Sequence, residues 1–445
     1  MVRALLSHSR TIALLLILVM ASSAWATWSI VIADSNTKEV AVGTVTCLNN
    51  YDLLAIVPVV VVGKGAGACQ ASGDFDGLRR PIIFQQLQLG TSPEEILQML
   101  ANIAGHQSRQ YGIADTQARM ITFTGTQCLQ WAGGVVGQQG TMVYAIQGNI
   151  LAGSCVVPAI EQAILNTAGD IPAKLMAGMQ AARQKGGDGR CSCSPSNPTH
   201  CGCPPLGFTK SGHIGGMVVA RVGDTDDPVC NASGCADGDY FMRLNVAFQP
   251  TGNPDPVIQL QGLFDTWRSN LIGRPDAIQS TVALNPRTLP PNGLATGTML
   301  ITLNDWRGER ISVAIQSLTV SHAPGSDGIS SIGAPTNNGD GTFSVALTAG
   351  TQAGTDRFRI IVDDGIRPVS LAPDPALRYF ALGDLNCDGS VDFGDINPFV
   401  LALANPATYA TEYPDCNALN ADINADGTVD FGDINPFVAL LVGGQ

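Results

Sequence analysis

The spacing of apolar and polar residues changes twice along the 445-residue chain. From residue 27 to about 269, short runs rich in β-branched residues alternate with segments whose apolar residues recur at helical spacing. Strands with helices between them predict a layered α/β or α+β domain. The runs predict strands at Trp28–Ala33, Glu39–Thr46, Leu54–Val62, Met120–Phe123, Met142–Ile146 and Met217–Arg221.

Two helices are predicted within this first region. Residues 92–95 (SPEE) have the pattern of a capping box with proline at the first helical position. The apolar positions that follow recur at helical spacing: Ile96, Leu97, Leu100 and Ile103. A second helix is expected from about Pro158 to Arg183.

The helical pattern disappears in the middle of the chain. From about Asp276 to Ala372, apolar and polar residues alternate in short runs that Pro, Gly, Asn and Asp interrupt, which predicts a small β-sandwich. The last 65 residues contain an internal repeat, GDLNCDGSVDFGDINPFV at 383–400 and ADINADGTVDFGDINPFV at 421–438. An apolar run, Ile396–Ala402 or Ile434–Leu441, predicts a helix after each repeated loop.

The first 26 residues have the pattern of a secretory signal peptide. Basic residues precede a short apolar core, Thr11–Met20, and Ala24 and Ala26 stand at positions −3 and −1 of the expected cut. The core is too short to span a bilayer, which needs about 20 residues. We therefore expect an exported protein, secreted or at the cell surface, that begins at Thr27 and has no membrane span after signal removal. The expected domains are 27–272, 273–378 and 379–445.

Export changes the interpretation of the 12 cysteines. In an oxidising compartment an even number favours disulfides. The cluster Cys191–Cys203 contains two C-x-C pairs whose four thiolates can also bind zinc. Because C-x-C is tighter than the usual zinc knuckle, disulfides are the preferred alternative. A bridge between Cys387 and Cys416 is a further hypothesis.

Charge is concentrated at the C-terminal end. The chain has a net charge of −13, and residues 381–445 contain ten Asp or Glu and no Lys or Arg. Such a segment is unsuited to nucleic acid or an anionic membrane and suits a cation. Each repeat places oxygen donors at positions 1, 3, 5, 7, 9 and 12, the spacing of an EF-hand-type calcium loop, with a glycine (Gly389, Gly427) at position 6. The expected ligands are Asp384, Asn386, Asp388, Ser390 (backbone), Asp392 and Asp395, and then Asp422, Asn424, Asp426, Thr428 (backbone), Asp430 and Asp433.

The duplicated loop and helix resemble a type I dockerin. The resemblance implies a small α-helical module that folds around two calcium ions and docks onto a cohesin. Dockerins often carry Ser or Thr at positions 10 and 11, which help to select the cohesin, whereas this chain has Phe393-Gly394 and Phe431-Gly432. The calcium ligands therefore carry over, and the partner is expected only to be cohesin-like.

The first region opens with TWSIVIAD and continues with VPVVVVGKGAGACQA (57–71), FTG (123–125) and QGNILAG (147–153). These motifs resemble the microbial family called domain of unknown function 1028, over roughly residues 27–269. The resemblance implies a four-layer αββα N-terminal nucleophile (Ntn) hydrolase fold. Cytoplasmic members expose the opening threonine by removing the initiator methionine. Here the expected signal cut exposes the same residue, Thr27.

A free N-terminal threonine can act as nucleophile and base together. Its α-amine has a pKa near ~8, against ~10.4 for lysine, so much more of it is unprotonated at neutral pH. The reaction also needs donors for the tetrahedral intermediate, for which Asn149 and then Gln70 are the candidates. The alternative for Asn149 is that it only caps a turn.

Three charged residues are further candidates in this region. Asp188 and Arg190 are expected to orient the amine or a charged substrate, unless Asp188-Gly189-Arg190 is an ordinary loop. Lys64 is a weaker candidate for electrostatic help. The chain has no G-x-S-x-G, H-E-x-x-H, P-loop or dinucleotide motif, so no organic cofactor is expected.

The stretch 340–366 resembles bacterial Ig-like domains of the invasin type, which implies a spacer or adhesive module. Two functions follow from the whole sequence. The first is an exported Ntn-type amidohydrolase that uses Thr27 on a small amide or peptide and is anchored through its calcium-dependent module. The alternative is a non-catalytic surface or scaffold protein in which the same fold only binds.

Overall fold

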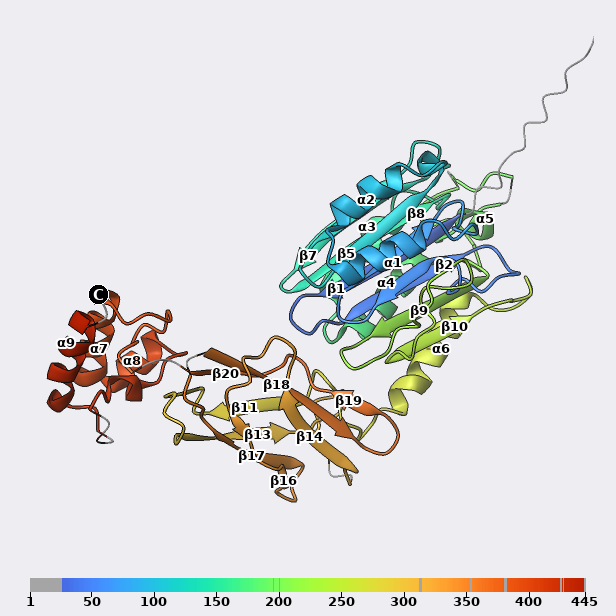
Figure 1. The fold of residues 1–445 in the computed structure, drawn as a ribbon. Coiled ribbons are helices and arrows are strands. Elements are labelled where there is room, and N and C mark those ends of the chain that lie inside the picture. Colours follow the sequence, from blue (N-terminus) through green and yellow to red (C-terminus); the bar gives the residue numbers. More distant parts are fainter. Residues whose placement is uncertain are drawn as a thin grey trace, which may run out of the picture.

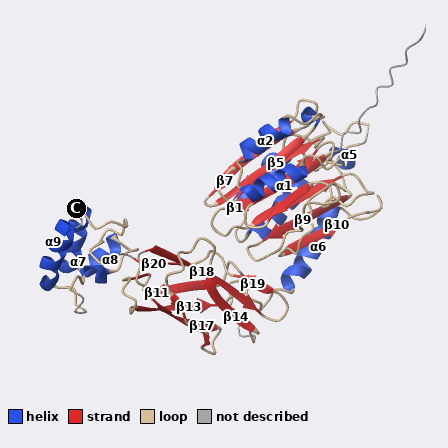
Figure 2. Cartoon of the chain, viewed as in Figure 1, coloured by secondary structure: helices blue, strands red, loops and turns tan. Residues whose placement is uncertain are grey.

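The computed structural model describes residues 26–443. Nine internal positions are not described: Pro195, His200, Ser312, Val313, Ala353, Phe380, Ala381, Ala425 and Gly427. The expected signal segment before Ala26 and the expected loop glycine Gly427 thus lie outside the described residues. Figure 1 shows three parts in chain order, and Figure 2 shows that helices flank a middle part built of strands.

The first part contains two antiparallel sheets. The six-stranded sheet has the order β10-β9-β2-β1-β8-β7, and the four-stranded sheet has the order β3-β4-β5-β6. The strands of the larger sheet are β1 (Thr27–Asp34), β2 (Val40–Thr46), β7 (Gly133–Gln139), β8 (Met142–Asn149), β9 (Ile214–Ala220) and β10 (Met242–Val246). Those of the smaller sheet are β3 (Pro58–Val61), β4 (Gly65–Gln70), β5 (Gln110–Asp115) and β6 (Met120–Thr124).

Helices cover the outer face of each sheet, so the layers run helix, sheet, sheet, helix (Figure 1). The larger sheet carries α3 (Val156–Asn166), α4 (Ile171–Gln184) and α6 (Pro256–Ser269), and the smaller sheet carries α1 (Arg80–Leu89) and α2 (Pro93–Ala101). Two short elements, η1 (His106–Ser108) and α5 (Gly189–Ser192), lie in connections. The first part is therefore an α/β domain, as the sequence predicts.

Strand β1 shows how the sequence produces these layers. Successive side chains of a strand point to opposite faces. Trp28, Ile30 and Ile32 pack in the core beneath the helices, whereas Val31 and Ala33 pack between the two sheets. All eight residues of β1 are buried, which explains why the run is apolar on both faces.

The helix predictions are confirmed in one case and corrected in the other. Helix α2 begins with the capping box at Ser92 and Glu95. The single helix expected over 158–183 is two helices, because Gly169 adopts a left-handed φ of 101° and the Asp170 side chain caps the start of α4. The strand expected from Leu54 begins only at Pro58, after a turn.

The middle part is all-β, as predicted. Its two sheets have the orders β11-β13-β17-β15 and β12-β20-β18-β14, and one apolar core lies between them. The strands are β11 (Thr281–Asn285), β12 (Thr288–Leu289), β13 (Thr296–Thr302), β14 (Ser317–His322), β15 (Ser331–Ile332), β16 (Thr336–Asn337), β17 (Thr342–Thr348), β18 (Gly354–Asp363), β19 (Pro368–Ser370) and β20 (Ala376–Tyr379).

The C-terminal part is small and helical. Its elements are η2 (Phe393–Asp395), α7 (Ile396–Ala404), α8 (Pro406–Glu412), η3 (Ala418–Ala421), η4 (Phe431–Asp433) and α9 (Ile434–Gly443). The rings of Phe399 and Phe437, from equivalent positions of the two repeats, stack at 4.1 Å in its core. The expected bridge between Cys387 and Cys416 is present.

A buried ion cluster joins the first part to the segment that leads into the second. Arg221, directly after β9, pairs with Glu39 at 2.7 Å and with Asp276 at 2.8 Å, and its guanidinium lies 3.6 Å from the centre of the Phe241 ring. Burial raises the pKa of Glu39. Burial alone would also raise the pKa of Asp276, but Arg221 holds it below its ordinary value. Arg221 is thus the cation that pairs with two buried carboxylates and lowers the pKa of each relative to burial alone.

Replacing Arg221 with methionine is expected to destabilise the protein by about 3–5 kcal/mol at pH 7, because it leaves two buried carboxylates without a cation. Without the arginine, the pKa of Glu39 rises further and the pKa of Asp276 rises above its ordinary value because burial is no longer offset, so the native state of the variant binds more protons than the unfolded state. Stability of the variant should therefore increase as the pH falls from 7 to 5. Urea unfolding at both pH values measures the change.

The matched control is Arg310→Met, which removes an exposed arginine that pairs with exposed Asp340 at 3.7 Å. This control should unfold like the parent protein at both pH values. An Arg221→Met protein whose stability loss is the same at pH 5 and pH 7 would contradict the assigned role.

Candidate functional site

Polar side chains gather at one end of the layer between the two sheets. Elsewhere this layer is filled mainly by valine, alanine, leucine and isoleucine. At the end where β1 begins, strand alternation turns polar residues of five strands into the same space, and all are at least 98% buried. They are Thr27, Ser29, Thr44, Thr46, Gln70, Gln110, Gln147 and Asn149.

Thr27 is the first residue of β1 and lies between two neighbouring strands. The register pairs it with Thr46 of β2 on one side and with Asn149 of β8 on the other. Its N–H donates to Asn149 Oδ1 at 3.2 Å. Its carbonyl oxygen accepts from Gln70 Nε2 at 2.8 Å, which comes from the opposite sheet. The structure therefore brings Thr27, Asn149 and Gln70 together.

Two glutamine side chains connect the sheets beside Thr27. Gln70 Nε2 also donates to Gln110 Oε1 at 2.9 Å, and Gln110 Nε2 donates to the Gly148 carbonyl of β8 at 2.8 Å. The hydroxyl of Ser29 donates to Gln70 Oε1. This network holds Gln70 in place from both sheets, so its amide has little freedom to move away from Thr27.

Asp188 and Arg190 lie on the other side of Thr27, at the start of α5. Asp188 is fully buried, accepts the Cys47 N–H at 2.6 Å and forms an ion pair with Arg190 at 2.8 Å. Arg190 Nη2 donates to the carbonyl oxygen of Ala26 at 2.9 Å, and the Thr46 hydroxyl donates to the same oxygen. Arg190 thus reaches the peptide bond that precedes Thr27, and Asp188 acts there only through its ion pair with Arg190.

Two candidates need correction. Lys64 lies in the turn between β3 and β4, at the opposite end of β4 from Gln70, so it does not belong to this group. Asn149 is the last residue of β8 and does not cap a turn. Its Oδ1 accepts a hydrogen bond from the Thr27 N–H, and this nitrogen would become the free amine after the expected cut. That contact orients the Thr27 nitrogen, whereas a catalytic role for Asn149 stays a prediction.

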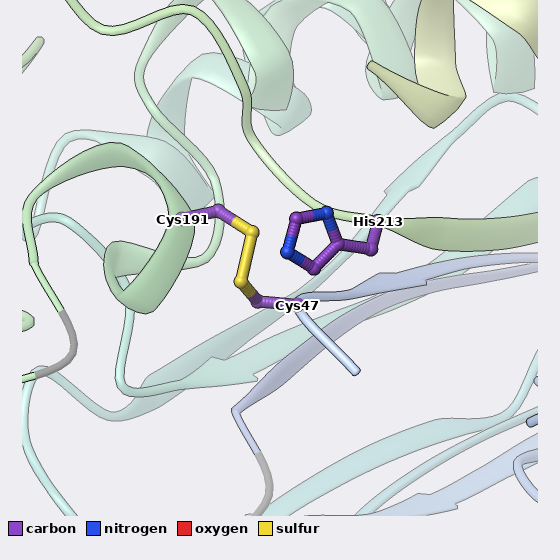
Figure 3. Close-up of side chains that lie close together, drawn as sticks. All are labelled: Cys47, Cys191 and His213. Atoms are coloured by element: carbon purple, nitrogen blue, oxygen red, sulfur yellow. A yellow bond between two sulfur atoms is a disulfide. The ribbon is translucent and has the colours of Figure 1, made fainter. Parts of the chain in front are cut away.

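A disulfide ties the two sides of the site together. Cys47 directly follows Thr46 and Cys191 directly follows Arg190, and the two cysteines are bonded to each other. The His213 ring lies beside this bond (Figure 3). Burial, and then Lys210, lower the pKa of His213, so it is neutral at pH 7. Although the three residues are spaced like metal ligands, sulfurs in a disulfide lack the thiolate that binds a metal ion.

The other cysteines of the cluster also form disulfides. Cys193 pairs with Cys201 within it, and Cys203 pairs with Cys155 outside it. This pairing favours the disulfide alternative over zinc. The even count does not lead to complete pairing, however, because Cys69 and Cys128 are buried free thiols.

The two repeated loops of the C-terminal part bring their carboxylates together in the same way. Asp395 accepts the N–H groups of Leu385 and Asn386, and Asp433 accepts that of Asn424 in the second loop. Asp384, Asp395 and Asp433 are at least 99% buried. Burial, and then the charges of Asp395 and Asp388, raise the pKa of Asp384 to about 6. Among the described residues, Asp384 Oδ1 has no hydrogen-bond partner. An oxygen-lined loop of this kind fits a hard cation.

The remaining expected ligands follow the loop backbone. The Asn386 amide contacts Asp388 at 2.9 Å, and the Asn424 amide contacts Asp426 at 3.0 Å. Asp392 and Asp430 cap η2 and η4. Ser390 and Thr428 donate their N–H groups to Asp388 and Asp426, and a ligand role for their carbonyl groups stays a prediction.

Five residues of the polar group around Thr27 escaped the sequence analysis as site residues: Ser29, Thr44, Thr46, Gln110 and Gln147. Each lies on the inner face of its strand, at the end where Thr27 lies. A period-2 reading of Val40–Thr46 would have shown Thr44 and Thr46 on one face of β2. Their approach to Thr27 depends on strand order, which the sequence does not display.

Residues 27–196 match the model of the family of unknown function DUF1028. This match covers the polar group around Thr27 and ends before the expected limit near residue 269. Residues 276–370 match the model described as invasin, domain 3, a wider range than the 340–366 expected. The dockerin resemblance of the C-terminal part stays a prediction.

Three solved structures are similar to parts of the chain. A Silicibacter pomeroyi protein of the DUF1028 family is 18% identical, covering 54% of this chain and 88% of its own, with a TM-score of 0.40. The Yersinia pseudotuberculosis adhesin InvE is 25% identical over 21% of this chain and 26% of its own, with a TM-score of 0.16. InvD of the same species is 22% identical, covering 22% of this chain and 27% of its own, with a TM-score of 0.18. None of the curated proteins matches the chain. In the part of the chain that the structure describes, every helix is too short or too polar to cross a membrane.

Removing the disulfide beside the site, in the double variant Cys47→Ala/Cys191→Ala, should lower stability by about 5 kcal/mol in the chain-entropy model, because the cross-link spans 144 residues. The matched control Cys230→Ala/Cys235→Ala opens a link over 5 residues, for which the same model gives about 2 kcal/mol. Guanidinium unfolding of both variants measures the difference. Equal losses would contradict the view that the Cys47–Cys191 bond holds distant segments together.

Proposed function

We propose that this protein is an exported amide hydrolase that uses Thr27, freed by removal of residues 1–26, as its nucleophile and base. The observation that carries the proposal is the hydrogen bond from the Thr27 nitrogen to Asn149 Oδ1, at 3.2 Å within a buried polar group. A peptide nitrogen in a strand normally pairs with backbone; here a side chain holds it. After the cut, the same contact would orient the free amine.

The surrounding residues supply what such a reaction needs. Gln70 fixes the Thr27 carbonyl, so the backbone of the nucleophile cannot swing away. Arg190 and Thr46 are donors directly beside the Thr27 nitrogen, and after the cut they would stabilise negative charge on a substrate oxygen placed there. Asp188 holds Arg190 in position. The match to DUF1028, a family of unknown function, leaves the substrate open, and we propose a small amide or peptide.

The bond to be cut sets an order of events. Ala26 is fully buried and Thr27 is 2% exposed. A peptidase that acts from outside cannot reach this bond in the folded domain. Removal of residues 1–26 by a signal peptidase must therefore precede formation of the larger sheet, as export in an unfolded state allows.

The C-terminal part adds a calcium-dependent anchor to this proposal. The buried carboxylates of its two loops, without a lysine or arginine after residue 380, favour binding of two calcium ions. By its resemblance to dockerins, the module would attach the enzyme to a cohesin-like partner. We place the protein outside the cytoplasm, secreted or at the cell surface.

A second function is favoured by a separate observation, the match of residues 276–370 to invasin domain 3. In that case the protein is a non-catalytic surface or scaffold protein, and the first domain binds a ligand without cleaving it. The two functions differ in one requirement. The enzyme needs a free Thr27 amine, whereas a binding protein tolerates any start.

The protein exported from a native-like host should begin at an unblocked Thr27, as N-terminal sequencing and intact mass will show. It should hydrolyse a member of a panel of aminoacyl p-nitroanilides and small N-acyl amides. Thr27→Ser should keep activity, whereas Thr27→Ala should lose it by a factor on the order of 10³ or more. The rate should rise with pH up to ~8, because the unprotonated amine is the base.

The control for this series is Thr141→Ala, in the turn beside the far end of β1, which should leave the rate unchanged. A start elsewhere, a blocked Thr27, or equal rates for Thr27→Ala and the parent would leave the binding protein as the better function.

Calcium titration of the chelator-treated protein should give two bound ions by calorimetry. Asp384→Ala should remove one ion and Asp422→Ala the other, because each deletes the first ligand of its loop. Asp415→Ala is the matched control, since Asp415 lies in the same module but outside both loops, beside Arg378. If Asp384→Ala and Asp422→Ala each still bind two calcium ions, these ligand sets are wrong.

A further inference from the structure

We propose that Arg190 and Thr46 form a binding site for the carboxylate of a small acyl group, at the place that the Ala26 carbonyl occupies. The inference rests on the proposed start at Thr27, and it names the chemistry of ligand that the site would take. It adds Thr46 to the residues that contact the ligand.

The carbonyl of Ala26 is held by two side chains. Arg190 Nη2 donates to it at 2.9 Å, and the Thr46 hydroxyl donates to the same oxygen. Arg190 Nη2 also lies 3.2 Å from Thr46 Oγ1, so the two donors contact each other as well as the oxygen. Both reach the atom that directly precedes the nucleophile.

The two donors are fixed by groups outside the segment to be removed. Asp188 contacts the guanidinium twice, at 3.2 Å to Nε and at 2.8 Å to Nη2. Asp188 is fully buried and is itself held by the N–H of Cys47 and the N–H of Arg190. Thr46 is fixed by its register opposite Thr27, and the Cys47–Cys191 bond joins the residues next to both donors. Loss of residues 1–26 therefore leaves the pair in place.

Removal of Ala26 takes away the acceptor that these donors share. A guanidinium and a hydroxyl in a largely buried site are more stable with an acceptor than without one. A carboxylate suits them, because a charge-assisted hydrogen bond to arginine is about twice as strong as a neutral one. It is also the group that hydrolysis of an amide leaves on the acyl product.

The charge of the site and the space beside the donors limit which ligands can bind. Asp188 balances Arg190, so the protonated Thr27 amine gives the site one net positive charge below pH ~8. A single carboxylate fits that charge, and its binding should weaken as the amine loses its proton. The Ala26 side chain is fully enclosed, so the space beside the donors is already filled by a methyl group. The acyl group should therefore be small, such as an alanyl group.

The test uses the full chain exported behind a signal peptide and shown by intact mass to begin at Thr27. Calorimetric titration with N-acetyl-alanine should give binding at pH 6.5 that weakens at pH 9. Thr46→Val, which keeps the shape of the side chain but loses the hydroxyl, should weaken binding about tenfold. N-acetyl-alaninamide, without the carboxylate, should bind much more weakly.

The matched control is Thr141→Val, which removes a threonine hydroxyl at the far end of β1, where it donates to Asp34 at 2.7 Å. It should bind N-acetyl-alanine like the parent. Arg190→Lys, which keeps the charge but loses the planar guanidinium, should also weaken binding. Binding of the amide as tightly as the acid, or unchanged binding by Thr46→Val, would overturn the proposal.

These results separate the carboxylate site from the hydrolase. Binding of N-acetyl-alanine that depends on Thr46, in a protein that cleaves none of the amides, supports the site and counts against the enzyme. Amide cleavage that depends on Thr27, in a protein that does not bind N-acetyl-alanine, supports the enzyme and overturns the site.

Discussion

The register of β1 between β2 and β8 is the constraint on which the proposed site depends. It places Thr27 opposite both Thr46 and Asn149. Because side chains alternate along a strand, a slip of one residue would turn Thr27 toward the helices and Trp28 toward the polar group. Burial of Trp28 and its apolar neighbours beneath α3, α4 and α6 therefore fixes the chemistry as well as the fold. Each large apolar side chain contributes about 1.5–3 kcal/mol on burial.

Most members of the polar end of the inter-sheet layer pair with one another, although Gln147 Nε2 has no hydrogen-bond partner among the described residues. Burying eight polar side chains away from water would be unfavourable if they did not form hydrogen bonds inside the protein. Gln70 and Gln110 meet this need by crossing from the smaller sheet to the carbonyl groups of Thr27 and Gly148. The same bonds set the distance between the sheets at Thr27, so the site is organised before any ligand binds. A site that is organised before the ligand binds would favour both catalysis and binding.

The sequence reveals features whose signals are local and misses those that depend on distant strands. The capping box at Ser92, the two calcium-type loops and the position of Thr27 after a signal-like segment are all short patterns. Gln70 and Asn149 were found through motifs that also are short. By contrast, Thr46 is 144 residues from Arg190, and nothing near it in the chain marks it as a partner. The expected helix over 158–183 is a different case, because its division was visible locally. Gly169 and the capping residue Asp170 together indicate that one helix ends and another begins there.

Buried carboxylates are neutralised differently along the chain. In the first two parts most of them pair with arginine, as Asp188 does with Arg190 and Glu39 with Arg221. The last part contains no lysine or arginine, although Asp384, Asp395 and Asp433 are buried as deeply. Folding of that part must then leave these charges to backbone N–H groups, to protons, or to a cation from solution. If calcium is that cation, as we propose, the module is compact only where calcium is abundant. Such a condition holds outside the cytoplasm, so the anchor and the proposed export of the enzyme would depend on the same environment.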